Sequence, residues 1–223
     1  MNRNNLFENE YDELCSKVIH GYNLLLDMGS QYLSNSIKQS SKVLSIGCGT
    51  ANEILAMKRQ QSQWSFIGFD ISSEMIDIAN NKISSSNIKN VQLIKSDIFG
   101  INESEFDAAF LSLVLARIKG DDKKIDFLRK ISEKLSNGAK LIYIDYFIDH
   151  NHLILQENIW VNNAYKNGLS TEFVNNALTF GKNELHFNTV DQSLNNFKIA
   201  GFNNPVLCAS ANMYKCYMFT KER

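Results

Sequence analysis

The chain has few of the residues that mark small secreted, fibrous or metal-dependent proteins. Among 223 residues there are one proline, four histidines and four cysteines. The cysteines are Cys15, Cys48, Cys208 and Cys216, and none of them shows CxxC spacing. Neither a disulfide framework nor a zinc cluster is therefore predicted. We expect a reducing compartment and a cytoplasmic protein.

An excess of one charge and long apolar runs are also missing. The 23 Lys and Arg residues nearly balance 24 Asp and Glu residues, so no global basic field would attract nucleic acid. No run approaches about 18 apolar residues, so no membrane span is expected. Residues 1–5 (MNRNN) carry no apolar core typical of a signal peptide. The 44% hydrophobic and 21% charged content is typical of a globular protein.

Short apolar runs alternate with helical patterns from residue 42 onward. Strands are predicted at 42–46, 64–69, 91–94, 106–112 and 139–146. Helices are predicted near 52–60, 73–83 and 121–135, the last ending at Asn137-Gly138. This alternation indicates an α/β fold, doubly wound, with a mostly parallel sheet covered on both faces.

The two ends of the chain depart from this rhythm. Residues 6–40 have the pattern of two helices, and residues 150–185 look helical and carry aromatic side chains. After a helix near 189–199, strands at 206–210 and 213–220 are so close that only an antiparallel pair is possible. We expect one domain over 1–223, with N-terminal cover helices in 1–40 and a helical substrate-side insertion at 147–188.

The strongest functional signal lies where the first strand ends, in Gly47-Cys48-Gly49-Thr50. Gly47 can turn sharply, and Gly49 lets a ligand approach the backbone. Asp70 closes the second strand 21 residues after Gly49, a spacing that suits a carboxylate bound to a ribose diol. A tight strand–helix turn and a helix cap are the simpler explanations of these two features.

A third element, Asp97-Ile98, follows the third strand. The carboxylate could take an adenine amino group while Ile98 covers the ring, or Asp97 could be a solvated loop residue. In order, spacing and strand position, the three elements together resemble the class I S-adenosylmethionine (SAM) dependent methyltransferases. The resemblance covers about residues 40–146. That family's seven-stranded sheet ends in an antiparallel hairpin, which the strands after Gly201-Phe202 would match.

The resemblance implies SAM as cofactor and S-adenosylhomocysteine as its product. The residues at the family's cofactor-binding positions are Gly47, Cys48, Gly49 and Thr50 around the methionine part, Asp70 at the ribose, Ile71 and Met75 beside the adenine, Asp97 and Ile98 at its edge, and Leu111 and Ser112 toward the substrate. Ser45 stands where the family usually has an acidic residue, and Ala51 where a third glycine is common. A nicotinamide-binding domain is the alternative, although the third glycine of its GxGxxG motif falls at Asn52.

A narrower similarity lies in Val18–Tyr22 (VIHGY). This segment resembles the helix start of a subgroup that contains the carboxy-SAM synthases and many small-molecule methyltransferases. The synthase needs an arginine in the insertion before the last helix, and residues 166–190 contain none. We therefore expect plain SAM.

Methyl transfer from a sulfonium depends on alignment and exclusion of water, so its catalytic residues are poorly specified by sequence. His20 and Tyr22 could close a lid, with His20 as base, or could form a packing pair. Asp145 lies near the end of the fifth strand and could reach the substrate or act as a structural cap. Strand alternation puts Tyr143 and Asp145 on one face and Tyr146 on the other.

Other chemistry-bearing residues have two interpretations each. Arg117 could bind an acidic substrate or form a surface salt bridge. The aromatic residues Trp160, Tyr165, Phe173 and Phe180 could line a pocket, a cation–π site for the sulfonium, or the core of the insertion. His150 and His152 have no obvious third ligand, so no metal is expected.

Together these observations predict methyl transfer to a small-molecule acceptor, with no membrane and, given the charge balance, no nucleic acid as partner. Another SAM-using reaction, such as cyclisation or aminocarboxypropyl transfer, remains open. So does a non-catalytic SAM-binding partner subunit. The sequence gives no prediction of oligomeric state.

Overall fold

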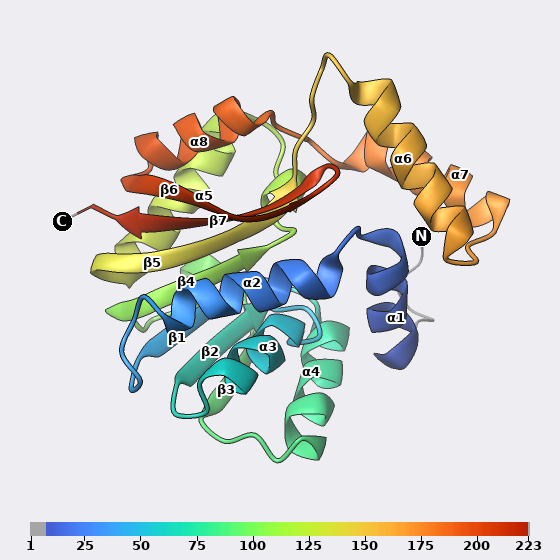
Figure 1. The fold of residues 1–223 in the computed structure, drawn as a ribbon. Coiled ribbons are helices and arrows are strands. Elements are labelled where there is room, and N and C mark those ends of the chain that lie inside the picture. Colours follow the sequence, from blue (N-terminus) through green and yellow to red (C-terminus); the bar gives the residue numbers. More distant parts are fainter. Residues whose placement is uncertain (1–7, 223) are drawn as a thin grey trace.

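A seven-stranded sheet with helices on both faces forms the centre of the molecule (Figure 1). The computed structural model describes residues 8–222, so the segment 1–5 discussed above lies outside the described residues. The strands are β1 (Lys42–Ile46), β2 (Ser65–Asp70), β3 (Val91–Lys95), β4 (Phe106–Ser112), β5 (Leu135–Tyr146), β6 (Phe202–Ala211) and β7 (Tyr214–Lys221). Their order is β3-β2-β1-β4-β5-β7-β6. Strand β7 is antiparallel to both its neighbours, and the other pairings are parallel. The predicted doubly wound, mostly parallel sheet with a C-terminal hairpin is confirmed.

Helices divide between the two faces of the sheet and one of its ends. They are α1 (Glu8–Val18), α2 (Tyr22–Ser34), α3 (Asn52–Gln60), α4 (Ser73–Ser85), α5 (Asp121–Lys134), α6 (Leu153–Lys166), α7 (Thr171–Glu184) and α8 (Val190–Ile199), with short 3-10 turns η2 (Ile98–Gly100) and η3 (Leu115–Arg117). Side chains of α2, α3 and α4 join one buried core, and those of α5 and α8 the other. Helices α1, α6 and α7 gather at one end of the sheet (Figure 1). No helix in the described part of the chain is long and apolar enough to cross a membrane.

The boundary between α5 and β5 differs from the prediction. The helix ends at Lys134, and Asn137-Gly138 lies inside the strand. Leu135 is buried and pairs with Phe106, and regular pairing resumes only at Lys140 with Ala108. The chain between these pairs forms a bulge in which Gly138 has a φ of 79°. Burial of Leu135 on the sheet thus outweighs the helix-ending signal of Gly138.

Helix α2 lies directly against the sheet, because Gly29 removes a side chain at the contact. A Cβ on Gly29 would lie 2.9 Å from Ile142 Cγ2 and 3.2 Å from Cys216 Sγ. Both neighbours are fully buried. Of the two helices expected as a cover, α2 is therefore a layer of the fold, and α1 alone remains at the end of the sheet.

We predict that Gly29→Ala destabilises the protein by about 1–3 kcal/mol, because the added methyl overpacks a filled core. The matched control is Gly181→Ala, also within a helix, whose new Cβ would have only Phe187 Cζ at 4.0 Å. That substitution should be neutral or stabilise by about 0.5–1 kcal/mol through helix propensity. Urea unfolding of both variants makes the comparison. Equal stabilisation by both would show that α2 does not pack this closely.

Candidate functional site

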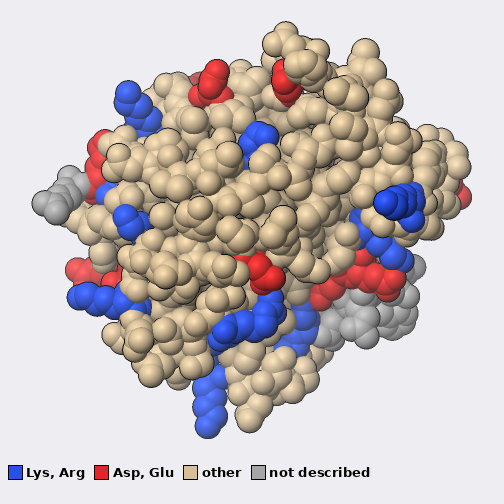
Figure 2. All heavy atoms as spheres, viewed as in Figure 1, with Lys and Arg blue, Asp and Glu red and all other residues tan. Residues whose placement is uncertain are grey.

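A cavity of about 420 Å³ lies where β1, β2 and β4 end. Its volume is in the range of small-molecule sites. Most of its lining comes from loops at the strand ends, from helix α1 and from the insertion helices α6 and α7. On the face of the molecule in Figure 2, acidic and basic residues are interspersed among uncharged ones. The cavity is a mainly apolar space at the end of a parallel sheet, and two helical segments, α1 and α6–α7, cover it.

The glycine loop after β1 forms one wall of the cavity. Gly47 and Gly49 both have left-handed backbone, with φ of 62° and 49°. A Cβ on Gly47 would lie 2.7 Å from Val114 Cγ2, whereas one on Gly49 would have no atom within 4 Å. Gly47 therefore permits close packing of two loops, and Gly49 leaves open space on the cavity side. Ala51, where a third glycine was noted as common, takes left-handed backbone as well, with a φ of 66°.

Asp70 joins the glycine loop to the loop after β2. Its Oδ2 accepts from the Gly49 amide at 3.0 Å, and its Oδ1 accepts from the Ser72 amide at 2.9 Å. Helix α4 is capped by Ser72, whose Oγ accepts from Met75 N. Asp70 is therefore not the side-chain cap of α4. It lines the cavity together with Ile71 and Met75, and Ile71 is 75% exposed.

Three of the other predicted cofactor residues lie outside the cavity wall. Asp97 caps η2, with Oδ1 accepting from the amides of Phe99 and Gly100. Ile98 and Leu111 are buried in the core that contains α5 and α8. Ser112, by contrast, lines the cavity. Along β4 the cavity wall therefore begins at Ser112, one residue after Leu111, which was also predicted to line it.

A buried carboxylate, Glu53, lies in the wall next to the glycine loop. Ser45 Oγ donates to its Oε1 at 2.5 Å, and the residue is 6% exposed. Burial raises the pKa of Glu53 to about 7, although the bond from Ser45 opposes this shift. Among the described residues, no Lys or Arg forms an ion pair with Glu53. Ser45 was noted above as a departure from the family, but its pairing with Glu53 was not predicted, because the partner lies on the following helix.

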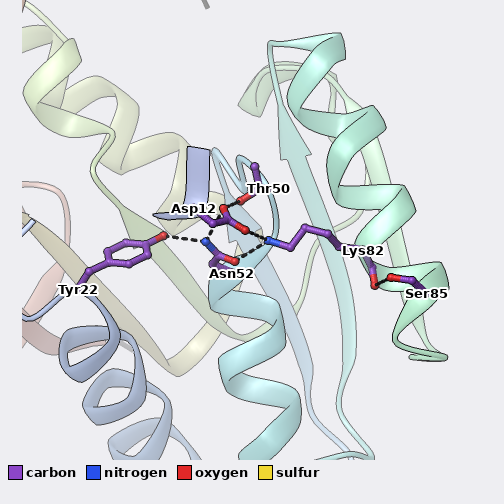
Figure 3. Close-up of polar contacts among 6 residues, drawn as sticks. All are labelled: Asp12, Tyr22, Thr50, Asn52, Lys82 and Ser85. Atoms are coloured by element: carbon purple, nitrogen blue, oxygen red, sulfur yellow. Dashed lines mark hydrogen bonds and ion pairs between the residues drawn. The ribbon is translucent and has the colours of Figure 1, made fainter. Parts of the chain in front are cut away.

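A polar network ties α1 to the glycine loop (Figure 3). The carboxylate of Asp12 accepts from Thr50 Oγ1 at 2.6 Å and from Asn52 Nδ2 at 2.8 Å, and it pairs with Lys82 Nζ. Asn52 also accepts from Lys82 and donates to the Tyr22 hydroxyl. The sequence did not reveal this network, since the residues that bond to one another are 30 to 70 positions apart. It holds α1 over the cavity.

The structure separates the two predicted N-terminal catalytic residues. Tyr22 lines the cavity, and burial raises the pKa of its phenol well above the usual value. His20 does not line the cavity, and its Nδ1 is buried without a hydrogen-bond partner among the described residues. Burial lowers the pKa of His20. Both side chains are therefore held in their neutral forms at neutral pH.

Asp145 faces away from the cavity, into the space beneath η3. Its Oδ2 accepts from the Ala116 amide at 3.1 Å and the Tyr143 hydroxyl at 3.3 Å, and its Oδ1 from the Tyr146 amide at 2.9 Å. Burial raises the pKa of Asp145 to about 6. As strand alternation predicted, Tyr143 and Asp145 share a face, and it is Tyr146 on the other face that lines the cavity. With these partners Asp145 holds η3 in place, so it is not positioned to touch a ligand in the cavity.

The insertion contributes aromatic side chains. Trp160, Phe173 and Phe180 line the cavity, whereas Tyr165 does not and is 43% exposed. The Arg117 guanidinium, also at the cavity, lies 5.7 Å from the centre of the Phe180 ring. The loop before α6 holds an exposed His152–Asp149 pair at 2.9 Å. Among the described side chains, no group of three or more His, Cys, Asp or Glu residues is arranged to hold a metal ion.

Comparisons with known proteins identify relatives of this chain in sequence and in fold. A family described as a methyltransferase domain matches residues 37–198. Carboxy-S-adenosyl-L-methionine synthase of Campylobacter hominis is 26% identical over 156 residues, which are 70% of this chain and 66% of that protein. Carboxy-S-adenosyl-L-methionine synthase 1 of Yersinia pseudotuberculosis is 25% identical over 93% of this chain and 88% of its own length. This chain thus spans just under two thirds of the first of these relatives.

Solved structures share the fold at lower identity. A putative O-methyltransferase from Nostoc punctiforme superposes with a TM-score of 0.71 at 15% identity, over 96% of this chain and 59% of that one. An O-methyltransferase family protein from Burkholderia thailandensis gives 0.70 at 12% identity, over 96% and 59%. The family match covers most of the chain, including the glycine loop and Asp70. The chain therefore belongs to the SAM-dependent methyltransferase family, as those residues had indicated.

Proposed function

We propose that the protein transfers the methyl group of SAM to a small-molecule acceptor by in-line displacement inside the 420 Å³ cavity. One observation carries this proposal. The Asp70 carboxylate and the glycine loop are fixed together at a cavity wall, and the same cavity continues to the aromatic residues of α6 and α7. Cofactor and acceptor would therefore share one enclosed space. Such enclosure aligns the reacting atoms and excludes water.

The adenosine part of SAM would lie along β2 and α4. Both Asp70 oxygens accept one amide each, so a lone pair on each remains for the ribose diol. Ile71 and Met75 would contact the adenine. Asp97 uses only Oδ1 as a cap, so its Oδ2 could accept from the adenine amino group at the margin of the cavity.

The methionine part would follow the loop Gly47–Thr50 toward Glu53. A buried carboxylate without an ion-pair partner is costly in its charged form. The ammonium of SAM would supply the missing cation. Glu53 would then take over the role of the acidic residue that is absent at Ser45.

Catalysis would rest on alignment rather than on a protein base. Burial raises the pKa of Tyr22, Tyr146 and Tyr214, which all line the cavity, so their phenols remain protonated. Burial also raises the pKa of the Cys15 thiol to about 11. An acceptor that is already nucleophilic as it enters the cavity fits these groups. Tyr22 would act as a hydrogen-bonding group, and His20 and Asp145 would not contact the reactants.

The cofactor site predicts a sharp effect of Asp70→Ala. Loss of the ribose contacts and of the Gly49 anchor should weaken binding of SAM and S-adenosylhomocysteine about 100-fold, as expected for about 3 kcal/mol of charged hydrogen bonds. Calorimetric titration measures this change. Asp77→Ala, an exposed carboxylate on the adjoining helix α4, is the matched control and should bind normally. Binding of NAD(P)H in place of the adenosyl compounds would overturn the proposal.

Glu53 predicts a pH dependence of cofactor binding. A cationic ligand favours the carboxylate form, so affinity for SAM should fall about tenfold per pH unit below the Glu53 pKa of about 7. Above that pH, affinity should level off. 5′-Methylthioadenosine lacks the ammonium and should show no such slope. Titrations between pH 5.5 and 8 compare the two ligands.

The variant Glu53→Gln separates this effect from folding. Because burial disfavours the charged form, the variant should be at least as stable as the original at pH 8. It should bind SAM weakly at every pH, without the slope. Persistence of the slope in Glu53→Gln would assign the titration to another group.

The bonds of Asp12 lead to a prediction about how helix α1 covers the cavity. Asp12→Ala leaves Lys82 without its carboxylate partner, so stability should fall by about 2 kcal/mol. Release of S-adenosylhomocysteine should become faster, because α1 loses its bonds to Thr50 and Asn52. Stopped-flow fluorescence of ligand release tests this. The control is Asp27→Ala, a half-buried carboxylate on α2 that pairs with Arg59. An unchanged release rate would show that α1 does not retain the cofactor.

The reaction products distinguish the remaining SAM chemistries. Methyl transfer yields S-adenosylhomocysteine and an acceptor heavier by one methylene unit, whereas aminocarboxypropyl transfer yields methylthioadenosine. An intramolecular cyclisation of SAM would also release methylthioadenosine, with a homoserine lactone in place of a heavier acceptor. Tight SAM binding with no turnover until a second protein is added would identify a partner subunit. Mass spectrometry of an incubation with a metabolite extract reads these outcomes directly.

A further inference from the structure

Arg117 stands at the cavity on a rigid support. It is the last residue of η3, the short turn that follows β4 along the chain. The preceding residue, Ala116, is fixed from both sides: its amide donates to Asp145 Oδ2 at 3.1 Å, and its carbonyl accepts from the His186 amide at 2.7 Å. Asp145 lies on β5, and His186 lies at the end of the insertion. The backbone that carries Arg117 is therefore held by the sheet and by the insertion together.

Among the described side chains the guanidinium has an aromatic neighbour but no ion-pair partner. It lies over the Phe180 ring, an arrangement that guanidinium groups favour. No carboxylate among the described side chains, which begin at Tyr11, forms an ion pair with Arg117. The salt-bridge interpretation drawn from the sequence is thus not supported by any pair in the described chain. The nearby cation Lys182, which also lines the cavity, already has Glu157 at 4.0 Å.

The positions of the charges separate two parts of the cavity. Asp70 and Glu53 lie by the glycine loop and would serve the cofactor. Arg117 contacts Phe180 of α7, in the part lined by the insertion. A ligand group bound there would have an apolar or aromatic body among Trp160, Phe173 and Phe180, and an anion at Arg117.

We propose that the acceptor is an organic acid, whose carboxylate pairs with Arg117 while its apolar body packs among the aromatic residues of the insertion. The proposal rests on the proposed function, since it names the substrate class of the same site. A carboxylate fits one guanidinium through two parallel hydrogen bonds. A phosphate dianion would favour a second free cation, and Lys182 is already paired. Arg117 would be a specificity-determining residue that is not involved in the transfer step itself.

The test uses the full chain saturated with S-adenosylhomocysteine, so that a failure of cofactor binding is seen separately and first. The probes are benzoate, phenylacetate, cinnamate and indole-3-acetate, each paired with its carboxamide, together with phenyl phosphate. Calorimetry and saturation-transfer NMR measure their binding. We expect at least one acid to bind about 10- to 100-fold more tightly than its amide, the range that a charged hydrogen-bond pair provides.

Variants assign that preference. Arg117→Gln should abolish the difference between acid and amide while leaving S-adenosylhomocysteine affinity within about twofold. Lys182→Gln, a cation of the same cavity, and the distant Arg59→Gln should keep the preference. The conservative Arg117→Lys should keep part of the preference for the acid, because lysine keeps the positive charge but lacks the two parallel N–H donors of the guanidinium.

Several results would overturn the proposal. These are equal binding of acids and amides, no binding by any acid, a preference for phenyl phosphate, or a preference that survives Arg117→Gln. A loss of S-adenosylhomocysteine affinity in Arg117→Gln would assign the guanidinium to the cofactor. Carboxy-S-adenosyl-L-methionine gives one further test. If it binds more tightly than SAM, and only when Arg117 is present, Arg117 pairs with a carboxylate of the cofactor, and the proposal is overturned as well.

Discussion

The carboxylate of Asp70 fixes two loops that come from different strands. It accepts from the Gly49 amide after β1 and from the Ser72 amide after β2. Because the strands are parallel and adjacent, both loops end at the same edge of the sheet. The loop after β4 is held against these two loops, because Gly47 packs so closely on Val114 that a Cβ would not fit. The cavity wall at the strand ends thus depends on one carboxylate and one missing side chain.

The groups that face the cavity differ in charge from one end to the other. Two carboxylates, Asp70 and Glu53, lie beside the glycine loop, whereas Arg117 of η3 and the Lys182–Glu157 pair of α7 and α6 line the part at the insertion. Between them the phenols are held neutral by burial. SAM carries its positive charges on the sulfonium and the ammonium, so the carboxylate end suits it. At the opposite end Arg117 has no ion-pair partner among the described side chains, so its charge remains for a second molecule.

Local patterns in the sequence were sufficient for most of the fold. The alternating apolar runs predicted five strands, and the two-residue gap at Ala211-Asn212 predicted the hairpin. The α5–β5 boundary was missed because it is decided by pairing of Leu135 with Phe106, a contact between distant segments. The helix-ending signal at Gly138 is local and says nothing of that partner.

The candidate site was predictable only where it follows strand ends. The glycine loop, Asp70 and Ser112 lie in the cavity wall because parallel strands end there. Glu53, Asp12 and Lys82 were missed, since each acquires its importance from a partner on another element. Their separations, such as 70 residues between Asp12 and Lys82, leave no spacing to recognise. Buried polar networks of this kind depend on the packed fold, whereas a turn depends on its own residues.

Asp145 shows how a residue can matter to a site without facing it. Its position near the end of β5 suggested a role at the substrate, and strand alternation correctly grouped it with Tyr143. Alternation alone does not say which of the two faces meets the cavity, and the structure gives that place to Tyr146. The charge of Asp145 acts on the backbone instead, at the Ala116 amide. Asp145, predicted from the sequence to contact the substrate, therefore holds the turn η3 in place. That turn carries Arg117, the residue proposed here to contact the substrate.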